Sequence, residues 1–241
     1  MSRSVSKPDF QYARSFNIYW DKLNQLPPEL EGLAWSDGKT EVNKGKWRDS
    51  FKAPTPADVF LNVEVGCNAG HVSVEWAKQN PNHRYIGIDW KFKMVYKFAE
   101  KIAKFKLDNL LAFRANAERL QYMFAPGEID YLHMFFPDPW PKKAQKKNRT
   151  ANSDWLKSVA PLISARGHFH LKTDHEEYFD FILANLEELK DTYEIIECTR
   201  NLHANHPNPK SLQIPDVTLF ERLFIKDGLP IYSVKFKPKR T

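Results

Sequence analysis

The stretch of sequence that decides the fold is VFLNVEVGCNAG, which runs from Val59 to Gly70. The apolar run up to Val65 has the composition of a buried strand, and a turn of small residues from Gly66 to Gly70 follows it. The next residues, His71 to Asn80, carry apolar side chains at helical spacing. A strand, a glycine turn and a helix in this order are typical of the opening unit of a nucleotide-binding α/β fold.

The next predicted strand, Arg84 to Asp89, ends in an acid, and an acid at the tip of the second parallel strand can reach the hydroxyls of a ribose. A dinucleotide site would need a G-x-G-x-x-G turn. Here the turn is Gly66-x-Asn68-x-Gly70, and the acid Glu64 precedes it. A carboxylate there would repel a pyrophosphate and attract the ammonium group of a methionine moiety. The pattern therefore favours S-adenosylmethionine over NAD as the cofactor.

A long amphipathic helix is predicted from Trp90 to Leu107, and a third strand from Asn109 to Arg114. Asn116 follows directly after the end of that strand. Its amide could contact the adenine edge of a nucleotide, and it could equally cap the next helix.

A second distinctive stretch, FFPDPWPKK from Phe135 to Lys143, comes after an apolar strand that begins at Ile129. Its three prolines cannot continue a β-ladder, so we expect a rigid turn at the end of the strand. The turn carries the carboxylate of Asp138, the ring of Trp140 and the ammonium group of Lys142. These groups suit a flat, anionic substrate such as a nucleotide base with its phosphate, and the alternative is a plain proline-rich loop.

The residues after this turn are strongly basic, from Lys142 to Arg149. A run of charges can simply be a solvated surface, but its place beside the predicted site favours contact with phosphates.

The rest of the chain continues the alternation of helices and strands. We expect a helix from Thr150 to Leu162, a strand from Gly167 to Asp174, a helix from His175 to Lys190, a strand from Tyr193 to Cys198, a short helix from Thr218 and a closing strand from Leu229 to Phe236. The long loop before Thr218 contains His203 and His206. No third or fourth ligand is spaced to join these histidines, so no metal site is expected.

Residues 1–50 differ from this pattern, because basic side chains alternate with aromatic ones such as Tyr19, Trp20 and Trp47. Such a segment could contact RNA through phosphates and stacked bases, or it could pack its aromatic rings on the main domain. We predict a partly ordered N-terminal arm over 1–50 and a catalytic domain over 51–241.

The composition limits the class of protein. The chain has 241 residues, 42% of them hydrophobic and 27% charged, as expected for an ordinary globular protein in the cytosol. No apolar stretch is long enough for a transmembrane helix, and the first residues lack the apolar core of a secretory signal. The net charge of +6 favours a polyanionic partner.

From about Asn62 to Phe236 the sequence resembles the tRNA (guanine-N7)-methyltransferase family, in its bacterial single-subunit form. Four blocks carry the resemblance, and they are Glu64 to Gly70, Gly87 to Asp89, Phe136 to Lys143, and Thr218 to Glu221 followed by Gly228 and Ile231-Tyr232. The resemblance implies a Rossmann-like α/β fold with a seven-stranded, mostly parallel sheet and an antiparallel last strand. It also implies S-adenosylmethionine as methyl donor and guanosine in the variable loop of tRNA as substrate.

The same resemblance assigns roles to residues. Those expected to bind the cofactor are Glu64, Gly66, Asp89, Asn116, Ala117 and Asp138. Asp138 is also the expected catalytic residue, and those expected to hold the guanosine or its RNA are Lys142, Asp174, Thr218 and Glu221. We expect a monomer or a weak homodimer.

The sequence departs from the family pattern at three places. Asn68 replaces the middle glycine, Asp89 replaces the usual glutamate, and residues 144–147 replace an arginine- and histidine-rich continuation. Asparagine tolerates a left-handed backbone, so the turn can form, while aspartate is one methylene shorter. We expect the first two changes to act on cofactor affinity more than on the fold.

Guanine N7 carries a free lone pair at neutral pH, so its methylation needs no general base, and Asp138 is expected to stabilise the charge that develops on the ring. Two other functions fit parts of the sequence. One is a methyltransferase acting on an exocyclic amine, and the other is an RNA-binding protein that has lost its cofactor through Asn68.

Overall fold

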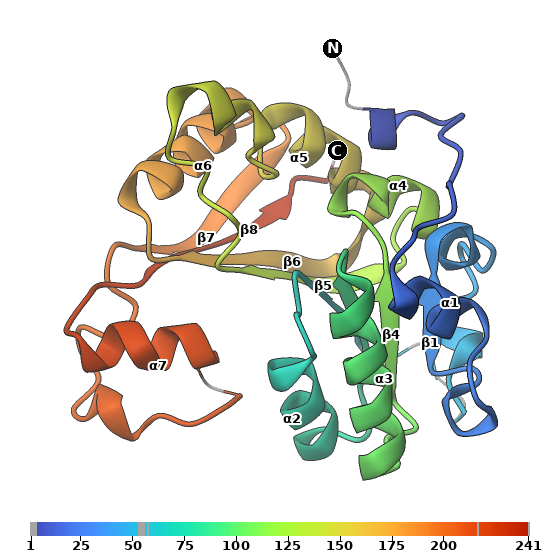
Figure 1. Cartoon of the computed structure of the whole chain (residues 1–241). Coiled ribbons are helices and arrows are strands. Elements are labelled where there is room, and N and C mark those ends of the chain that lie inside the picture. Colours follow the sequence, from blue (N-terminus) through green and yellow to red (C-terminus); the bar gives the residue numbers. More distant parts are fainter. Residues whose placement is uncertain (1–3, 53–55, 57, 216, 241) are drawn as a thin grey trace.

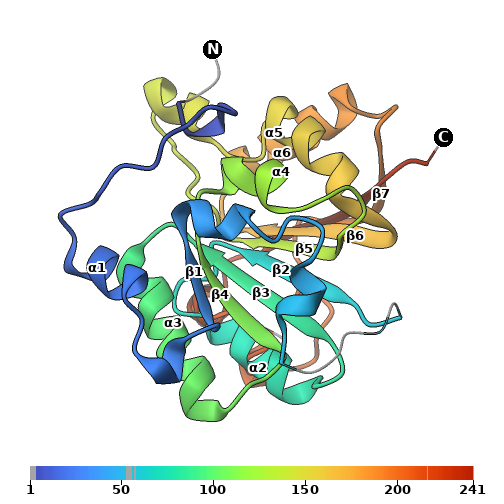
Figure 2. The same cartoon turned by 90° about the vertical axis from the view of Figure 1, so that its right-hand side faces the viewer.

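A single sheet separates two layers of helices in the computed structural model, which describes residues 4–52, 56, 58–215 and 217–240 (Figure 1). Helices α1, α2 and α3 cover one face of the sheet, and α4, α5 and α6 cover the other (Figures 1 and 2). The last helix, α7, lies apart from both groups, on the same side as α2 (Figure 1).

Within the described residues, the sheet has eight strands in the order β1-β4-β3-β2-β5-β6-β8-β7. Their bounds are β1 Ala34–Ser36, β2 Leu61–Val65, β3 Arg84–Asp89, β4 Leu110–Arg114, β5 Ile129–Phe135, β6 Ile163–Thr173, β7 Tyr193–Thr199 and β8 Tyr232–Pro238. Among the described residues, β8 pairs antiparallel with both of its neighbours, β6 and β7, and the other pairs are parallel. The expected mostly parallel sheet with an antiparallel last strand is confirmed.

The expected count of seven strands misses β1, which the described structure adds at the edge of the sheet. Ala34, Trp35 and Ser36 pair in parallel with residues 112–114 of β4. Three residues are too short for a recognisable alternation, and their partner lies far along the chain.

The helices follow the periodicity of the sequence. Their bounds are α1 Ile18–Asn24, α2 His71–Gln79, α3 Phe92–Phe105, α4 Leu120–Met123, α5 Ser153–Val159, α6 Glu176–Glu188 and α7 Leu219–Lys226. The expected helix from Thr150 begins only at Ser153, because Asn152 caps it by accepting a hydrogen bond from the backbone N–H of Trp155.

Residues 4–50 contribute to the cores on both faces of the sheet. Trp47 is fully buried in the core that includes β2, β5 and β6, and Leu23 and Leu30 belong to the core around α3. The aromatic ring of Trp47 therefore packs on the main domain, as one of the two interpretations held. Residues 1–3 of the expected arm lie outside the described residues, and a domain boundary at residue 50 remains a prediction.

Phe98 of α3 fixes how the helix meets the glycine turn. It is fully buried, and a Cβ atom on Gly70 would lie 2.1 Å from its ring. A Cβ on Gly87 of β3 would lie 2.4 Å from the same ring. Both glycines are thus required by close packing. In the part of the chain that the structure describes, no helix is both long and apolar enough to span a bilayer.

We expect Gly70→Ala to lower the free energy of unfolding by about 2–4 kcal/mol, because it combines a left-handed φ of 67° with the collision against Phe98. Gly127→Ala is the matched control. Gly127 has a similar φ of 71°, but a Cβ there meets no described atom within 4 Å, so only about 1 kcal/mol should be lost. Urea unfolding measures both variants, and equal losses would show that the contact with Phe98 is not limiting.

Candidate active site

The predicted site residues gather where the parallel strands end. β2 pairs with β5 in parallel register, with Val65 opposite Met134. The glycine turn and the proline-rich turn therefore both start at the carboxyl-terminal ends of neighbouring strands. Because β3 lies on the other side of β2, the chain changes direction across the sheet here, and α/β sheets bind their ligands at such a switch point.

The glycine turn is held by the neighbouring strand. The backbone N–H groups of Gly66 and Cys67 both donate to the carbonyl of Ile88, at 2.8 and 3.1 Å. Asn68 has a left-handed backbone with φ of 53°, so asparagine does preserve the turn. A Cβ on Gly66 would meet no described atom within 4 Å, which leaves the backbone at Gly66 open to the close approach of a ligand.

Asp89 lies at the end of β3 and is bound to that turn. Its Oδ2 accepts a hydrogen bond from the backbone N–H of Asn68 at 2.9 Å, and its Oδ1 accepts one from Lys91 at 2.8 Å. Burial raises the pKa of Asp89, while these two backbone groups lower it. Each carboxylate oxygen keeps a second lone pair, so both can still accept from ribose hydroxyls.

Glu64 is a buried carboxyl group below the turn. The hydroxyl of Ser73 in α2 donates a short hydrogen bond to its Oε2. Burial raises the pKa of Glu64 to about 7, although Ser73 and the charge of Lys172 act in the opposite direction. A cationic group placed beside Glu64 would favour the ionised form and lower this pKa.

Asn116 and Ala117 follow the end of β4. The Oδ1 of Asn116 accepts a hydrogen bond from the backbone N–H of Glu118 at 2.9 Å, so it caps a short 3-10 helix. The carbonyl of Ala117 accepts from Trp155 Nε1 at 2.9 Å. The capping interpretation of Asn116 is confirmed, and a contact of either residue with an adenine remains a prediction.

The proline-rich turn is strained at both ends. Phe136 and Trp140 have left-handed backbones, with φ of 53° and 45°. The N–H of Phe136 donates to the carbonyl of Lys172 at 2.8 Å, and Arg149 Nε donates to the carbonyl of Pro139 at 2.8 Å. Asp138 lies between these two anchors and is exposed, so its carboxylate is accessible to a ligand.

The last block of the sequence forms a buried ionic network. Glu221 is 0% exposed and makes a capping box with Thr218, in which each side chain binds the backbone N–H of the other residue. Lys172 Nζ donates to both carboxylate oxygens of Glu221, at 2.9 and 3.1 Å. His203 Nε2 lies 3.2 Å from Oε1 of the same carboxylate. This network ties α7 and the long loop to the end of β6.

Sequence reasoning missed Lys172 and assigned no such role to His203. The available signal was a lysine inside an apolar strand, two residues before Asp174. A charge that becomes buried needs a partner, but the sequence does not say which one. Asp174 itself is exposed, directly beyond the end of β6.

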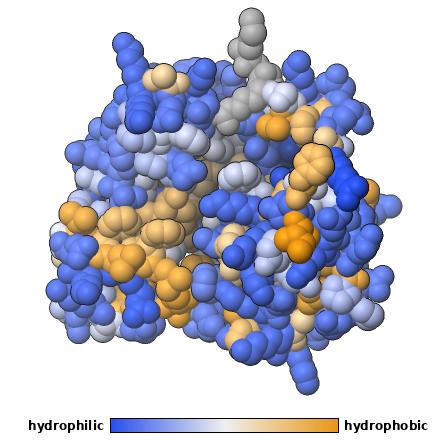
Figure 3. All heavy atoms as spheres, viewed as in Figure 1, coloured by the Kyte–Doolittle hydropathy of each residue, from blue (hydrophilic) through white to orange (hydrophobic). Residues whose placement is uncertain are grey.

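Aromatic rings join α7 to the proline-rich turn. The ring of Phe136 lies 6.2 Å from that of Phe220 and 5.9 Å from that of Phe224, centroid to centroid. Part of the apolar surface of α7 stays uncovered, since Phe220 is 54% and Leu223 58% exposed. In the space-filling view, hydrophobic side chains gather at the left, the side on which α7 lies in Figure 1 (Figure 3).

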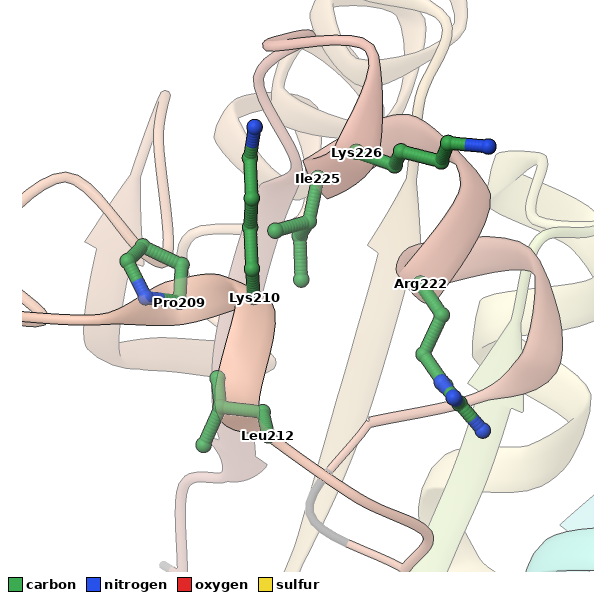
Figure 4. A pocket seen from close by; sticks show the side chains of 6 residues that line it. All are labelled: Pro209, Lys210, Leu212, Arg222, Ile225 and Lys226. Carbon is green, nitrogen blue, oxygen red and sulfur yellow. The ribbon is translucent and has the colours of Figure 1, made fainter.

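A pocket of about 170 Å³ lies between α7 and the loop before it (Figure 4). It is lined by Pro209, Lys210, Leu212, Arg222, Ile225 and Lys226. Arg222 and Lys226 are one helical turn apart, on the side of α7 opposite to Phe220 and Phe224. The pocket contains none of the predicted site residues, so it is separate from the edge where the chemistry is expected.

The strand order, the acid before an open glycine turn and the acid at the end of β3 define the class of S-adenosylmethionine-dependent methyltransferases. Solved structures of that class share the fold. The 16S rRNA methyltransferase KamB matches with a TM-score of 0.53 and 15% identity, over 75% of this chain and 88% of its own. An antibiotic-related methyltransferase matches with a TM-score of 0.52 and 19% identity, over 76% of this chain and 88% of its own.

The sequence comparisons go further. A family model described as a putative methyltransferase matches residues 58–234. A tRNA (guanine-N(7)-)-methyltransferase of Christiangramia forsetii is 32% identical over 90% of this chain and 92% of its own length. One from Lachnoclostridium phytofermentans is 30% identical over 90% and 99%. The chain belongs to the tRNA (guanine-N7)-methyltransferase family, and its cofactor is S-adenosylmethionine.

The residues present fit this cofactor. An uncovered backbone at Gly66 lies between the buried carboxyl of Glu64 and the backbone-bound carboxylate of Asp89. A cation and a ribose can each find an acceptor there.

We expect Glu64→Gln to change how stability depends on pH in the cofactor-free protein. The pKa of Glu64 is about 7 in the folded state, against 4.5 without burial. Below pH 4.5 both states hold the proton. Between pH 4.5 and 7 only the folded state keeps it, so the wild type loses stability relative to the variant as pH rises, by roughly 3 kcal/mol in all.

Urea unfolding at a series of pH values from 4 to about 8 measures this difference. Above pH 7 the two curves should run parallel. Curves that are parallel over the whole range would contradict the raised pKa of Glu64.

Proposed function

We propose that this protein transfers the methyl group of S-adenosylmethionine to guanine N7 in the variable loop of tRNA, which forms 7-methylguanosine. The observation that carries the proposal is the parallel pairing of β2 with β5. Because of this pairing, the glycine turn and the proline-rich turn with Asp138 start from neighbouring strand ends. The family to which the chain belongs supplies the substrate and the acceptor atom.

Four elements would hold the cofactor. Glu64 would accept the ammonium group of the methionine moiety, the open backbone of Gly66 would lie against it, and Asp89 would accept from the ribose. Asn116 and Ala117, at the end of β4, would contact the adenine. Bound there, S-adenosylmethionine supplies an electrophilic methyl group.

Asp138 is the proposed catalytic residue. Guanine N7 has its lone pair available, so the site has no proton to remove and acts mainly by holding the base in line. An exposed carboxylate on a rigid turn can accept hydrogen bonds from the guanine edge. It also lowers the energy of the positive charge that appears on the ring as the methyl group arrives.

The tRNA would be held on either side of Asp138. Lys142 is exposed and can meet the phosphate backbone, and Asp174 is exposed at the end of the next strand. Thr218 and Glu221 are buried, so they would act on the guanosine by fixing the first turn of α7 beside Phe136. We further propose that the protein works in the cytoplasm as a monomer or a weak homodimer.

The test is to incubate purified protein with S-adenosylmethionine and unmodified tRNA and to map the product. Methylation at N7 makes the nucleotide sensitive to reduction and aniline cleavage, and we expect one cleavage, in the variable loop. A methylated exocyclic amine, which resists this cleavage, would point to the other type of enzyme. Calorimetric binding of tRNA without any binding of S-adenosylmethionine would point to a non-catalytic protein.

We expect Asp138→Ala to lower kcat by roughly a hundredfold or more, while the Kd for S-adenosylmethionine changes by less than about threefold. The reason is that Asp138 acts on the charge of the transition state more than on the bound cofactor. Single-turnover kinetics and calorimetry measure the two quantities. Asp191→Ala removes an exposed carboxylate beyond α6 and should leave both unchanged. An equal loss of turnover and cofactor affinity in Asp138→Ala would contradict the assignment.

A further inference from the structure

The basic run after the proline-rich turn is not uniform. Lys142, Lys143 and Lys147 are exposed, as phosphate contacts would be. Arg149, at the end of the run, is only 2% exposed. The expectation that the whole run contacts phosphate is therefore wrong for Arg149, whose side chain lies inside the protein.

The guanidinium group of Arg149 bridges the proline-rich turn and α6. Its Nε donates to the carbonyl of Pro139 at 2.8 Å. The carbon of the guanidinium lies 5.2 Å from the ring centre of Tyr178 and 5.1 Å from that of Phe181, within the range of cation–π attraction. Its Nη2 is 3.7 Å from Glu177 Oε1 and has no hydrogen-bond partner among the described residues. A buried arginine with an unsatisfied nitrogen is costly, so a role beyond packing is worth seeking.

The turn needs a contact of this kind. A left-handed backbone costs a residue with a side chain roughly 1–2 kcal/mol, and both Phe136 and Trp140 adopt one. Such conformations persist only where the surroundings impose them. The prolines between them have no N–H groups to donate, so hydrogen bonds that fix this part of the turn must go to its carbonyl groups. The Pro139 carbonyl, directly after Asp138, is the one that Arg149 binds.

The charges of Asp138 and Arg149 both act on Tyr178 of α6. Burial raises the pKa of Tyr178 to about 12, the charge of Arg149 lowers it, and the charge of Asp138 raises it. Tyr178 therefore lies within electrostatic range of both residues. The exposed carboxylate of Asp138 thus directly precedes the carbonyl that the buried guanidinium group binds.

We propose that Arg149 is a positioning residue, which is anchored on the rings of α6, holds the Pro139 carbonyl and thereby sets the place of Asp138 for methyl transfer. It does not contact RNA. This inference rests on the proposed function, because it assumes that Asp138 meets the reacting base.

Two substitutions test it. Arg149→Met keeps the length and packing without the charge or the donor, and Arg149→Lys keeps the charge without the flat donor group that spans Pro139 and the two rings. Lys157→Met, an exposed lysine of α5, is the neutral control, and Lys143→Met shows what the loss of a phosphate contact looks like.

The expected signature is a split between turnover and binding. For Arg149→Met, kcat at saturating tRNA and cofactor should fall between about tenfold and a hundredfold, since small displacements of a catalytic group cost that much. The KM for tRNA should change by less than about threefold, with an unaltered salt dependence, and Arg149→Lys should recover only part of kcat.

Two results would overturn the proposal. A raised KM with a flatter salt dependence, as in Lys143→Met, and full recovery by Arg149→Lys would make Arg149 a phosphate contact. A lowered urea midpoint with unchanged kcat for the folded fraction would make it a purely structural residue.

Hydrogen exchange separates this inference from the proposed function. In Arg149→Met, the peptide covering residues 135–149 should exchange faster than in wild type and Lys157→Met, while the peptide covering Gly66 to Gly70 should not change. Unchanged exchange at residues 135–149 would refute the claim that Arg149 fixes the turn, even in an active enzyme. Faster exchange together with a wild type that does not methylate guanine N7 would show that Arg149 fixes the turn. It would also refute the proposed function.

Discussion

β2 and β5 run side by side in parallel, with Val63 opposite Leu132 and Val65 opposite Met134, and the candidate site depends on this pairing. Their ends lie side by side, so the two turns that hold the predicted site residues start from neighbouring points. A shift of one residue in the register would turn the alternate side chains of either strand to the opposite face. Both strands lie in the middle of the sheet and are largely buried. A shift of β2 would turn the polar Asn62 and Glu64 into the core that now holds its apolar side chains, so the observed register is favoured.

The acidic side chains near these strand ends are bound by hydrogen-bond donors of the protein itself. Asp89 is bound by backbone N–H groups, Glu64 by a serine hydroxyl, and Glu221 by Lys172 and a helix cap. A buried ion pair contributes little net stability, but the removal of one partner leaves a charge stranded at high cost. The pair of Lys172 and Glu221 therefore serves to fix α7 against β6 in one arrangement. The contacts of Phe136 with Phe220 and Phe224 also hold this helix beside the proline-rich turn.

The sequence predicted those parts of the protein that depend on local pattern. The strand, glycine turn and helix from Val59 onward, the acid at Asp89 and the rigid turn around Asp138 were all visible, because each is set by neighbours in the chain. Contacts between distant residues were not. β1 is too short to show a period, and nothing near Lys172 names Glu221 as its partner. Arg149 shares a basic run with exposed lysines, and only the fold shows that it lies inside.

The edge strand β1 has a consequence for the order in which the molecule can be built. Ala34 pairs with Ala112, and Trp47 is enclosed by side chains such as Phe113 and Phe124, so these early residues have no partners until the chain has reached β4 and α4. On a ribosome the N-terminal segment leaves first and must wait, with several aromatic rings still in water. Contacts between distant residues close slowly, and apolar surface left uncovered meanwhile invites association with other chains. The segment with β1 and Trp47 is therefore synthesised before its partners and can pack against them only late in folding.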